Sequence, residues 1–239
     1  MTPQENEYND LLTEIGQLTI ITMLLPVAVA LVRYRYLNKP TRVFLGYLLA
    51  TIAVNLIEQA FIWSVNTHTS FWLPYLTRWQ IGDTHFLQIL AYLKNFLLLG
   101  WYFGRIVPTR IGRWIVGVAL ALSLLAVVDY LWLTGYHMPG VLMPTLNGVF
   151  TTTLPMIHLW FLVRRDQKVS LSRIPYFWFS TGLILSYLFQ LLFFFLGQKI
   201  YQTDFLLYVK LSIAGNFLRV LSQVVFAYGF SQGKLLRFL

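Results

Sequence analysis

Seven apolar stretches alternate with short polar connections along the chain, and each stretch is long enough to cross a lipid bilayer. A crossing helix needs about 20 mostly apolar residues. We expect these spans near residues 14–32, 43–65, 85–104, 114–133, 143–163, 176–197 and 205–230. The pattern therefore predicts an all-α membrane protein whose residues 1–239 form a single seven-transmembrane-helix bundle.

The seventh stretch carries a regularly spaced set of polar residues. They are Ser212, Asn216, Arg219 and Gln223. Their spacing of i, i+4, i+7 and i+11 places all four on one face of a helix. An arginine that faced lipid near mid-span would cost between about 3 and more than 10 kcal/mol. We therefore expect this face to point at other helices, with Arg219 as the inner anchor of a polar interior.

The second and third stretches each carry a charged residue that a membrane interior does not tolerate alone. Glu58 shares a helical face with Asn55, and Lys94 lies beside Asn95. A buried carboxylate must be paired or protonated, because desolvation disfavours its charged form. We expect Glu58 and Lys94 to lie at similar depths on antiparallel helices and to form an ion pair. The pair either locks two helices together or borders a ligand cavity or a proton-linked switch.

Two further polar faces complete the predicted interior. The face of the third stretch consists of Gln88, Tyr92 and Asn95, and that of the fifth of Asn147, Thr151, Pro155 and His158. We expect the fifth-span face to look towards the seventh span. Its alternative role is an ordinary hydrogen-bonded helix contact, which is also the commoner role of a single histidine such as His158.

The inward faces together predict a polar network that lines an intramembrane pocket open to the outer side. A purely structural bundle needs only small residues and a few hydrogen bonds, whereas ionisable residues inside a membrane are functional-site candidates. The network comprises Asn55, Glu58, Lys94, Asn95, Asn147, His158, Asn216, Arg219 and Gln223.

Composition supports the membrane assignment. Hydrophobic residues make up 57% of the chain and charged residues only 11%, whereas a soluble domain carries about a quarter charged residues. The absence of cysteine excludes disulfides, thiolate metal sites and a cysteine nucleophile.

The net charge of +9 is explained by membrane topology rather than by nucleic-acid binding. Basic residues gather after the first, third and fifth spans and in the tail. They are Arg33, Arg35, Lys39 and Arg42; Arg105, Arg110 and Arg113; Arg164, Arg165, Lys168 and Arg173; and Lys234 and Arg237. The positive-inside rule then predicts a multi-pass protein of the cell inner membrane, with its N-terminus outside and its C-terminus in the cytoplasm.

The outward connection from Asn66 to Thr84 is the longest, and its aromatic residues either lie at the lipid headgroups or form a lid over the bundle. Asp129, at the outer end of the fourth span, is expected to be solvated. The three outward histidines (His68, His85 and His137) allow a metal site, but their spacing does not specify one.

Motifs do not favour an enzyme or a photoreceptor. The sequence has no HExxH, no GxSxG and no pair of intramembrane aspartates, so we expect no catalytic activity and no cofactor. A retinal Schiff base needs a lysine deep in the bundle, whereas Lys210 lies near the outer end of its span and off the polar face. The retinal-type photoreceptor is thus a remote alternative.

The sixth stretch, IPYFWFSTGLILSYLFQLLFFFL, together with Asn216, resembles the uncharacterised small seven-span proteins of the Bacteroidota. The residues that carry this resemblance are Pro175, Phe177, Trp178, Gly182, Tyr187 and Asn216. The chain departs from that family in the third span, where an acidic residue is common and this chain has Lys94 and Asn95. Some members are encoded near sensor histidine kinases, so the resemblance implies a signalling association.

These observations favour a non-enzymatic membrane sensor, receptor or regulatory component. We expect its partners to be the lipid bilayer, a small-molecule ligand and a cytoplasmic or membrane signalling protein such as a histidine kinase. The alternative is a small-solute transporter or permease. Repeated halves are common in such proteins, and no repeat is evident in this sequence.

Overall fold

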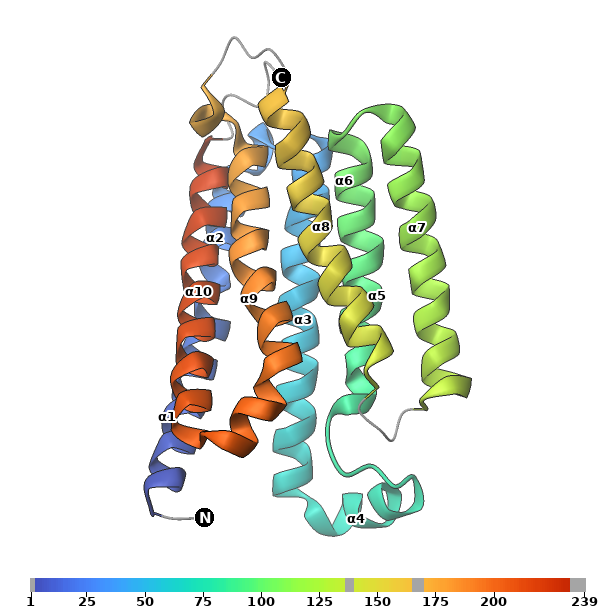
Figure 1. Cartoon of the computed structure of the whole chain (residues 1–239), viewed down its shortest axis with the longest axis vertical. Helices are drawn as coiled ribbons and strands as arrows, with labels where there is room; N and C mark the ends of the chain where they lie inside the picture. The colour runs from blue at the N-terminus through green and yellow to red at the C-terminus, as the bar shows by residue number, and fades with distance from the viewer. Residues whose placement is uncertain (1–2, 136–139, 165–169, 233–239) are drawn as a thin grey trace. The chain divides into compact units, whose positions relative to one another are not determined.

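The computed structural model describes residues 3–135, 140–164 and 170–232 and is all-α over these ranges (Figure 1). Seven helical segments in it are long and apolar enough to cross a membrane. They are Glu14–Val32, Lys39–Thr67, His85–Ile106, Thr109–Leu133, Leu142–Arg164, Pro175–Gly197 and Phe205–Ser231. The seven predicted spans are therefore confirmed, and the chain is a multi-pass membrane protein.

The first span is built from two helices, α1 (Pro3–Thr22) and α2 (Leu24–Val32). Pro26 explains the break between them, because proline has no backbone N–H to donate to the carbonyl four residues earlier, that of Thr22. At the same break, the Thr22 side chain donates its hydroxyl to the Thr19 carbonyl at 2.7 Å.

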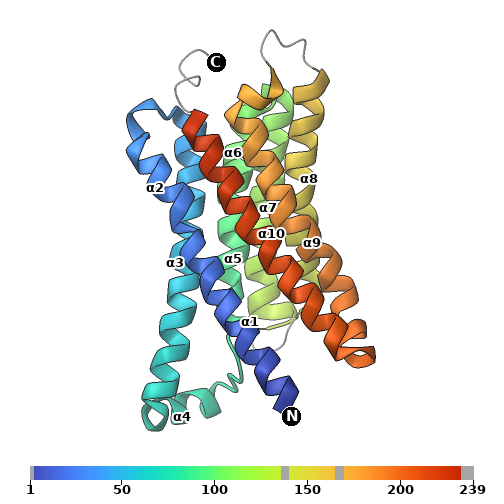
Figure 2. The same ribbon diagram turned by 90° about the vertical axis from the view of Figure 1, so that its left-hand side faces the viewer.

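The chain divides into two compact units. Unit 1 comprises Met1–Arg42 and Gly148–Leu239, and unit 2 comprises Val43–Asn147. Unit 1 contains α1, α2, the short helices η1 (Tyr34–Tyr36) and η5 (Leu171–Arg173), most of α8 (Leu142–Arg164), α9 (Pro175–Thr203) and α10 (Phe205–Ser231). In this unit α10 packs against α9 and also contacts α1 and α2 (Figure 2).

Glycine allows close packing of α9 against α10. A Cβ atom on Gly182 would lie 2.4 Å from the Phe226 ring, and one on Gly229 would lie 2.7 Å from the Phe179 ring. Each phenylalanine therefore occupies the space that a larger residue would need. Asp204 separates the two helices and caps α10, since its carboxylate accepts the Leu207 backbone N–H at 2.9 Å.

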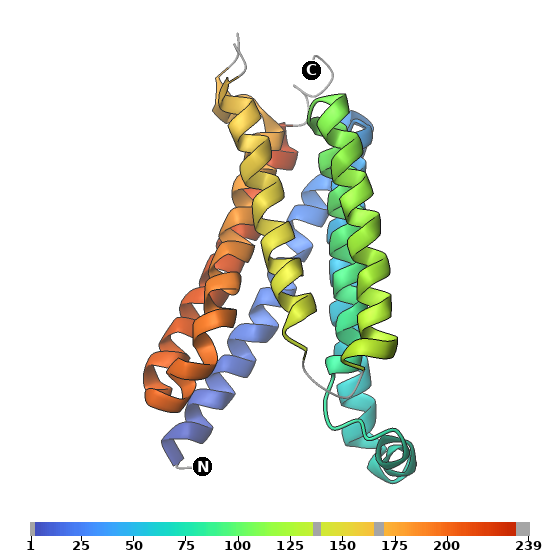
Figure 3. The same ribbon diagram turned by 45° about the vertical axis from the view of Figure 1, so that its right-hand side comes forward.

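Unit 2 holds most of the second span, which is α3 (Lys39–Thr67), and the third and fourth spans. Its other elements are α4 (Thr69–Arg78), η2 (His85–Leu87), α5 (Gln88–Lys94), η3 (Asn95–Leu99), α6 (Gly100–Ile106), α7 (Thr109–Val128) and η4 (Asp129–Leu133). Figure 3 shows α6 and α7 side by side. The two backbones touch, because a Cβ on Gly112 would lie 2.2 Å from the Gly104 carbonyl oxygen.

Two segments of unit 2 are π-helical rather than α-helical. They are η3 in the third span and η4 at the end of the fourth. Such wide turns disrupt the regular hydrogen-bond ladder and are frequent at functional sites. Both segments lie within predicted spans whose apolar pattern did not reveal them.

Candidate functional site

A small polar cavity of about 40 Å³ lies in unit 2, among η2, α5, α7, η4 and the beginning of α8. An ordered water needs about 10–15 Å³ of such space, so the cavity has room for about three waters. Its lining consists of His85, Gln88, Ile89, Tyr92, Ala126, Asp129, Tyr130, Thr134, Gly135, Gly140, Met143 and Pro144. A polar cavity at the end of membrane spans is a candidate for a binding site.

Asp129 is the charged group of this cavity and is only 5% exposed. Thr134 donates its hydroxyl to the Asp129 Oδ1 atom at 2.8 Å. The backbone N–H groups of Thr134 and Gly135 donate to the Asp129 carbonyl at 3.0 and 3.2 Å. Gly135 has a φ of 77°, a left-handed conformation that suits glycine and ends the span here. The second carboxylate oxygen, Oδ2, accepts no hydrogen bond from the described residues.

The cavity has a negative rather than a positive lining. Its described lining residues include one carboxylate and no lysine or arginine. The His85 Nδ1 atom lies 2.5 Å from the Asp83 carboxylate, so one of the two ring nitrogens is bonded to a residue outside the lining. Tyr92 interacts electrostatically with Asp129 and donates its hydroxyl to Gln88 at 2.8 Å.

One helical turn beyond Tyr92, the same face of the third span reaches Asn95. Its Nδ2 atom donates to the Asn147 Oδ1 atom at 2.8 Å, and Asn95 is only 3% exposed. The structure thus joins two of the residues that the sequence selected. The hydrogen bond links η3, which follows the cavity-lining helix α5 in the chain, to the beginning of α8.

Lys94 and Glu58 do not form the predicted ion pair. The Lys94 Nζ atom donates to the Thr51 hydroxyl at 3.0 Å and lies 5.2 Å from the Tyr47 ring centroid. The Glu58 carboxylate instead accepts the Thr84 hydroxyl at 2.7 Å. Lys94 is level with Thr51, and Glu58 lies seven residues further along α3, about 10 Å at 1.5 Å per residue. The prediction failed because apolar patterning does not fix the register of antiparallel helices to within two turns. Asn55, on the same helix, is half-buried.

The other predicted residues lie in unit 1, where His158 belongs to a contact between α8 and α9. His158 is 3% exposed, its Nδ1 atom lies 2.8 Å from the Ser180 hydroxyl, and its ring packs edge-on against Tyr176. We expected this face of the fifth span to look towards the seventh span, but the structure places His158 against the sixth. This geometry matches the alternative role of the face, in which His158 makes an ordinary hydrogen-bonded contact between helices.

The polar face of the seventh span lies partly against α9. Ser222 accepts a hydrogen bond from Ser186 of α9 at 2.6 Å, and Gln223 beside it is 5% exposed. Arg219 is half-buried, lies 3.5 Å from the Asn216 carbonyl oxygen Oδ1 and interacts electrostatically with Tyr187. No carboxylate of the described chain forms an ion pair with Arg219.

Sequence reasoning missed the central residue of the cavity, since Asp129 was expected to be solvated. The structure buries it, because the π-helical turn and Thr134 fold back over the carboxylate. The available signal was an acidic residue within an otherwise apolar run. Of the outward histidines, His137 lies outside the described residues. Within the described residues, no group of three acidic, cysteine or histidine side chains is arranged to hold a metal.

Comparison with known proteins identifies no relative: no family model, curated protein or solved structure matches the chain.

Proposed function

We propose that the chain is a sensor or receptor of the cell inner membrane that recognises a small polar ligand in the cavity of unit 2 and has no catalytic activity of its own. The observation that carries this proposal is the polar cavity around the buried carboxylate of Asp129. Burying a carboxylate in a membrane span is costly, and such residues commonly mark ligand or ion sites. The distribution of basic residues supports an orientation with the cavity on the outer side and the C-terminus in the cytoplasm.

The two π-helical segments supply a means of response. Asp129 begins η4 and lines the cavity, while Asn95 begins η3 and bonds to Asn147. A ligand that binds one arrangement of these turns more tightly shifts the population towards it. The basic inner connections then offer a surface for a cytoplasmic or membrane partner, and the resemblance to Bacteroidota proteins favours a sensor histidine kinase.

A small-solute transporter is the second candidate, and the same π-helical segments favour it. Transporters commonly build their substrate sites at interrupted helices. Here π-helical segments interrupt the third and fourth spans, and the one in the fourth span, η4, contributes Asp129 and Tyr130 to the cavity. The retinal alternative gains no support, because the Lys210 side chain is exposed near the beginning of α10.

Two measurements on the purified chain separate these functions. Thermal unfolding in lipid nanodiscs, screened against small polar compounds, should find a stabilising ligand; at 100 times Kd, binding adds about 2.7 kcal/mol of stability. Asp129→Asn should abolish the stabilisation, whereas Asp204→Asn, at an exposed carboxylate outside the lining, should retain it. Flux of the same ligand into proteoliposomes should not exceed that of empty liposomes. Ligand-dependent flux through the protein would replace the receptor with the transporter.

A further inference from the structure

The charge of the cavity in unit 2 restricts what it can bind. Asp129 has one side-chain donor, the neutral Thr134 hydroxyl, and its Oδ2 atom accepts no hydrogen bond from the described residues. A neutral hydroxyl does not compensate a buried negative charge. The described lining holds no lysine or arginine, so a cationic ligand would supply the positive charge that this carboxylate lacks among its bonded partners.

The other lining groups suit an organic cation with N–H donors. Tyr92 donates its proton to Gln88, so its own oxygen still has lone pairs that can accept a hydrogen bond. Tyr92 and Tyr130 are both lining residues, and aromatic rings attract cations through their faces. A carboxylate oxygen, a phenol oxygen and two rings together match an ammonium group.

A bare metal ion fits this lining less well. Calcium takes six to eight oxygen ligands, whereas the described lining supplies one carboxylate. No group of three candidate metal-ligating side chains occurs in the described residues.

The size of the cavity sets a second restriction. A volume of about 40 Å³ holds about three waters, which is far below the roughly 300 Å³ of a drug-sized ligand site. The cavity therefore accommodates an ammonium head with very few carbon atoms, and a longer amine must leave its chain outside.

We propose that the cavity is a binding site for a primary ammonium group, seated between the Asp129 carboxylate and the rings of Tyr92 and Tyr130. This inference rests on the proposed function, because it names the ligand class of the same site.

The test is a titration of the full chain in nanodiscs with methylammonium chloride at constant ionic strength, with thermal unfolding as the readout. The dimethyl, trimethyl and tetramethyl ammonium salts serve as a series of rising volume and falling N–H count, and sodium chloride serves as the salt control. We expect methylammonium to bind at least ten times more tightly than tetramethylammonium. Equal stabilisation by every monovalent chloride overturns the proposal without any mutation.

Two variants locate the site. Asp129→Asn should weaken methylammonium binding at least tenfold. Asp204→Asn, at an exposed carboxylate that caps α10 and does not line the cavity, should leave it unchanged. A folded Asp129→Asn protein that binds methylammonium as tightly as the parent overturns the assignment.

The outcomes also separate this inference from the proposed function. If other polar compounds stabilise the chain through Asp129 and amines do not, the amine assignment fails and the receptor stands. If methylammonium binds through Asp129 and is carried into proteoliposomes, the receptor fails and the amine assignment stands.

Discussion

Lys94 shows how a single cation is accommodated inside a span without a carboxylate. Its ammonium group donates to the Thr51 hydroxyl and lies over the Tyr47 ring, at 3.0 Å and 5.2 Å respectively. A hydrogen bond to a neutral acceptor and a cation–π contact each contribute on the order of 1 kcal/mol or more. The positive charge is thus held by neutral groups of α3, and Glu58 is left to bond with Thr84.

Because Glu58 and Lys94 have separate partners, their substitution effects should add. We expect Glu58→Gln and Lys94→Met each to destabilise the protein, and the double variant to equal their sum within about 0.5 kcal/mol. Unfolding by detergent titration measures all three. A coupling energy well above that margin would restore the ion pair.

The Asn95–Asn147 hydrogen bond should behave in the opposite way. Hydrogen bonds between membrane helices contribute roughly 0.6 kcal/mol on average and at most about 2 kcal/mol. A double-mutant cycle of Asn95→Ala and Asn147→Ala should therefore give a coupling of about that size. Asn66→Ala, at an exposed position near the end of α3, is the matched partner for a control cycle with Asn95→Ala. The contact is refuted if the two cycles give the same coupling.

At the scale of elements, the α6–α7 crossing depends on the direct contact of Gly104 with Gly112. A Cβ on Gly112 would lie 2.2 Å from a backbone oxygen, which cannot rotate away as a side chain can. Gly117 lies on the same helix with nothing within 4 Å of its Cβ position. Alanine at Gly112 and alanine at Gly117 can therefore be compared: both change helix propensity, but only the first adds a Cβ atom against a neighbouring backbone.

Gly112→Ala should therefore destabilise the protein by about 2 kcal/mol or more, since overpacking a close contact typically costs 1–3 kcal/mol. Gly117→Ala should be neutral or stabilising by up to about 1 kcal/mol, because alanine favours helix. Detergent-induced unfolding of the two variants provides the measurement. Equal effects of the two substitutions would mean that the helices do not cross at Gly112.

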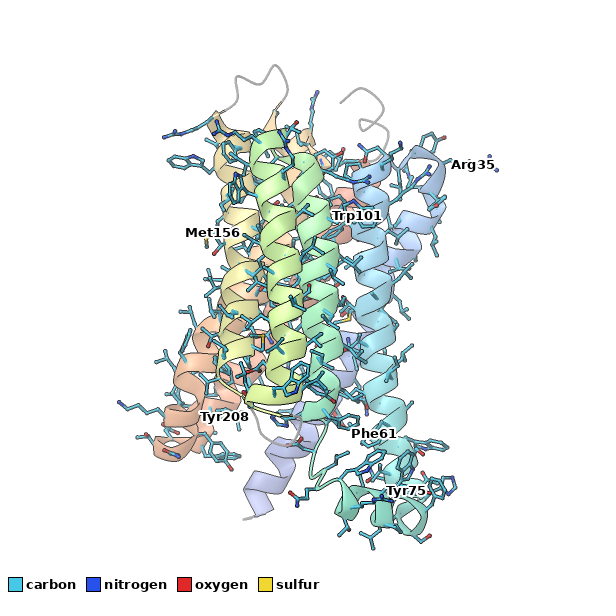
Figure 4. The ribbon with its side chains drawn as sticks, turned by 90° about the vertical axis from the view of Figure 1, so that its right-hand side faces the viewer. Arg35, Phe61, Tyr75, Trp101, Met156 and Tyr208 are labelled. Carbon is cyan, nitrogen blue, oxygen red and sulfur yellow. The ribbon has the colours of Figure 1, made fainter. Side chains whose placement is uncertain are left out.

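The short helix α4 has the features of a helix at the membrane surface. It begins two residues after the second span ends, and its Trp72 ring lies 5.4 Å from the Phe61 ring of α3; Figure 4 labels Phe61 on α3 and Tyr75 on α4. Trp72 donates to the Ser64 hydroxyl at 2.9 Å, which ties α4 to α3. Phe71 and Tyr75 are 60% and 44% exposed, so these rings are available to lipid headgroups.

Spin labels can test this position, because the chain has no native cysteine. Tyr75 and Thr77 lie about 160° apart around the helix at 100° per residue, with Tyr75 on the apolar side. A nitroxide at Tyr75→Cys should collide mainly with oxygen, which concentrates in lipid. A nitroxide at Thr77→Cys should collide mainly with a water-soluble nickel reagent. If both labels favour the nickel reagent, α4 stands away from the membrane.

Hydrophobic patterning predicted the elements of this protein well and their registers poorly. It located the seven spans because about 20 apolar residues are required wherever a helix crosses a bilayer. It did not predict η3 and η4, because a π-helical turn has no distinct apolar period. The central residue of the cavity was missed for the same reason, since the burial of Asp129 depends on η4 and Thr134.

At the scale of the whole molecule, the basic residues of the connections combine with aromatic side chains. Arg105 lies over the Trp101 ring at 4.8 Å and Arg164 over the Trp160 ring at 3.8 Å. Tryptophan is typical of membrane interfaces, and arginine of the cytoplasmic one. These pairs therefore support the proposed orientation, in which the cavity of unit 2 faces outwards.

The most direct test of this account asks from which side the cavity can be reached. Gln88→Cys places a thiol at an exposed position of the lining, and Arg110→Cys places one at an exposed position in the first turn of α7. Each is treated with a membrane-impermeant thiosulfonate reagent in right-side-out and in inside-out vesicles, with and without methylammonium.

For a receptor whose cavity opens outwards, Gln88→Cys should react only in right-side-out vesicles, and its reaction should be slower with methylammonium present. Arg110→Cys should react only in inside-out vesicles. Reaction of Gln88→Cys from both sides would contradict this account, because a site that is reached alternately from each side of the membrane belongs to a transporter.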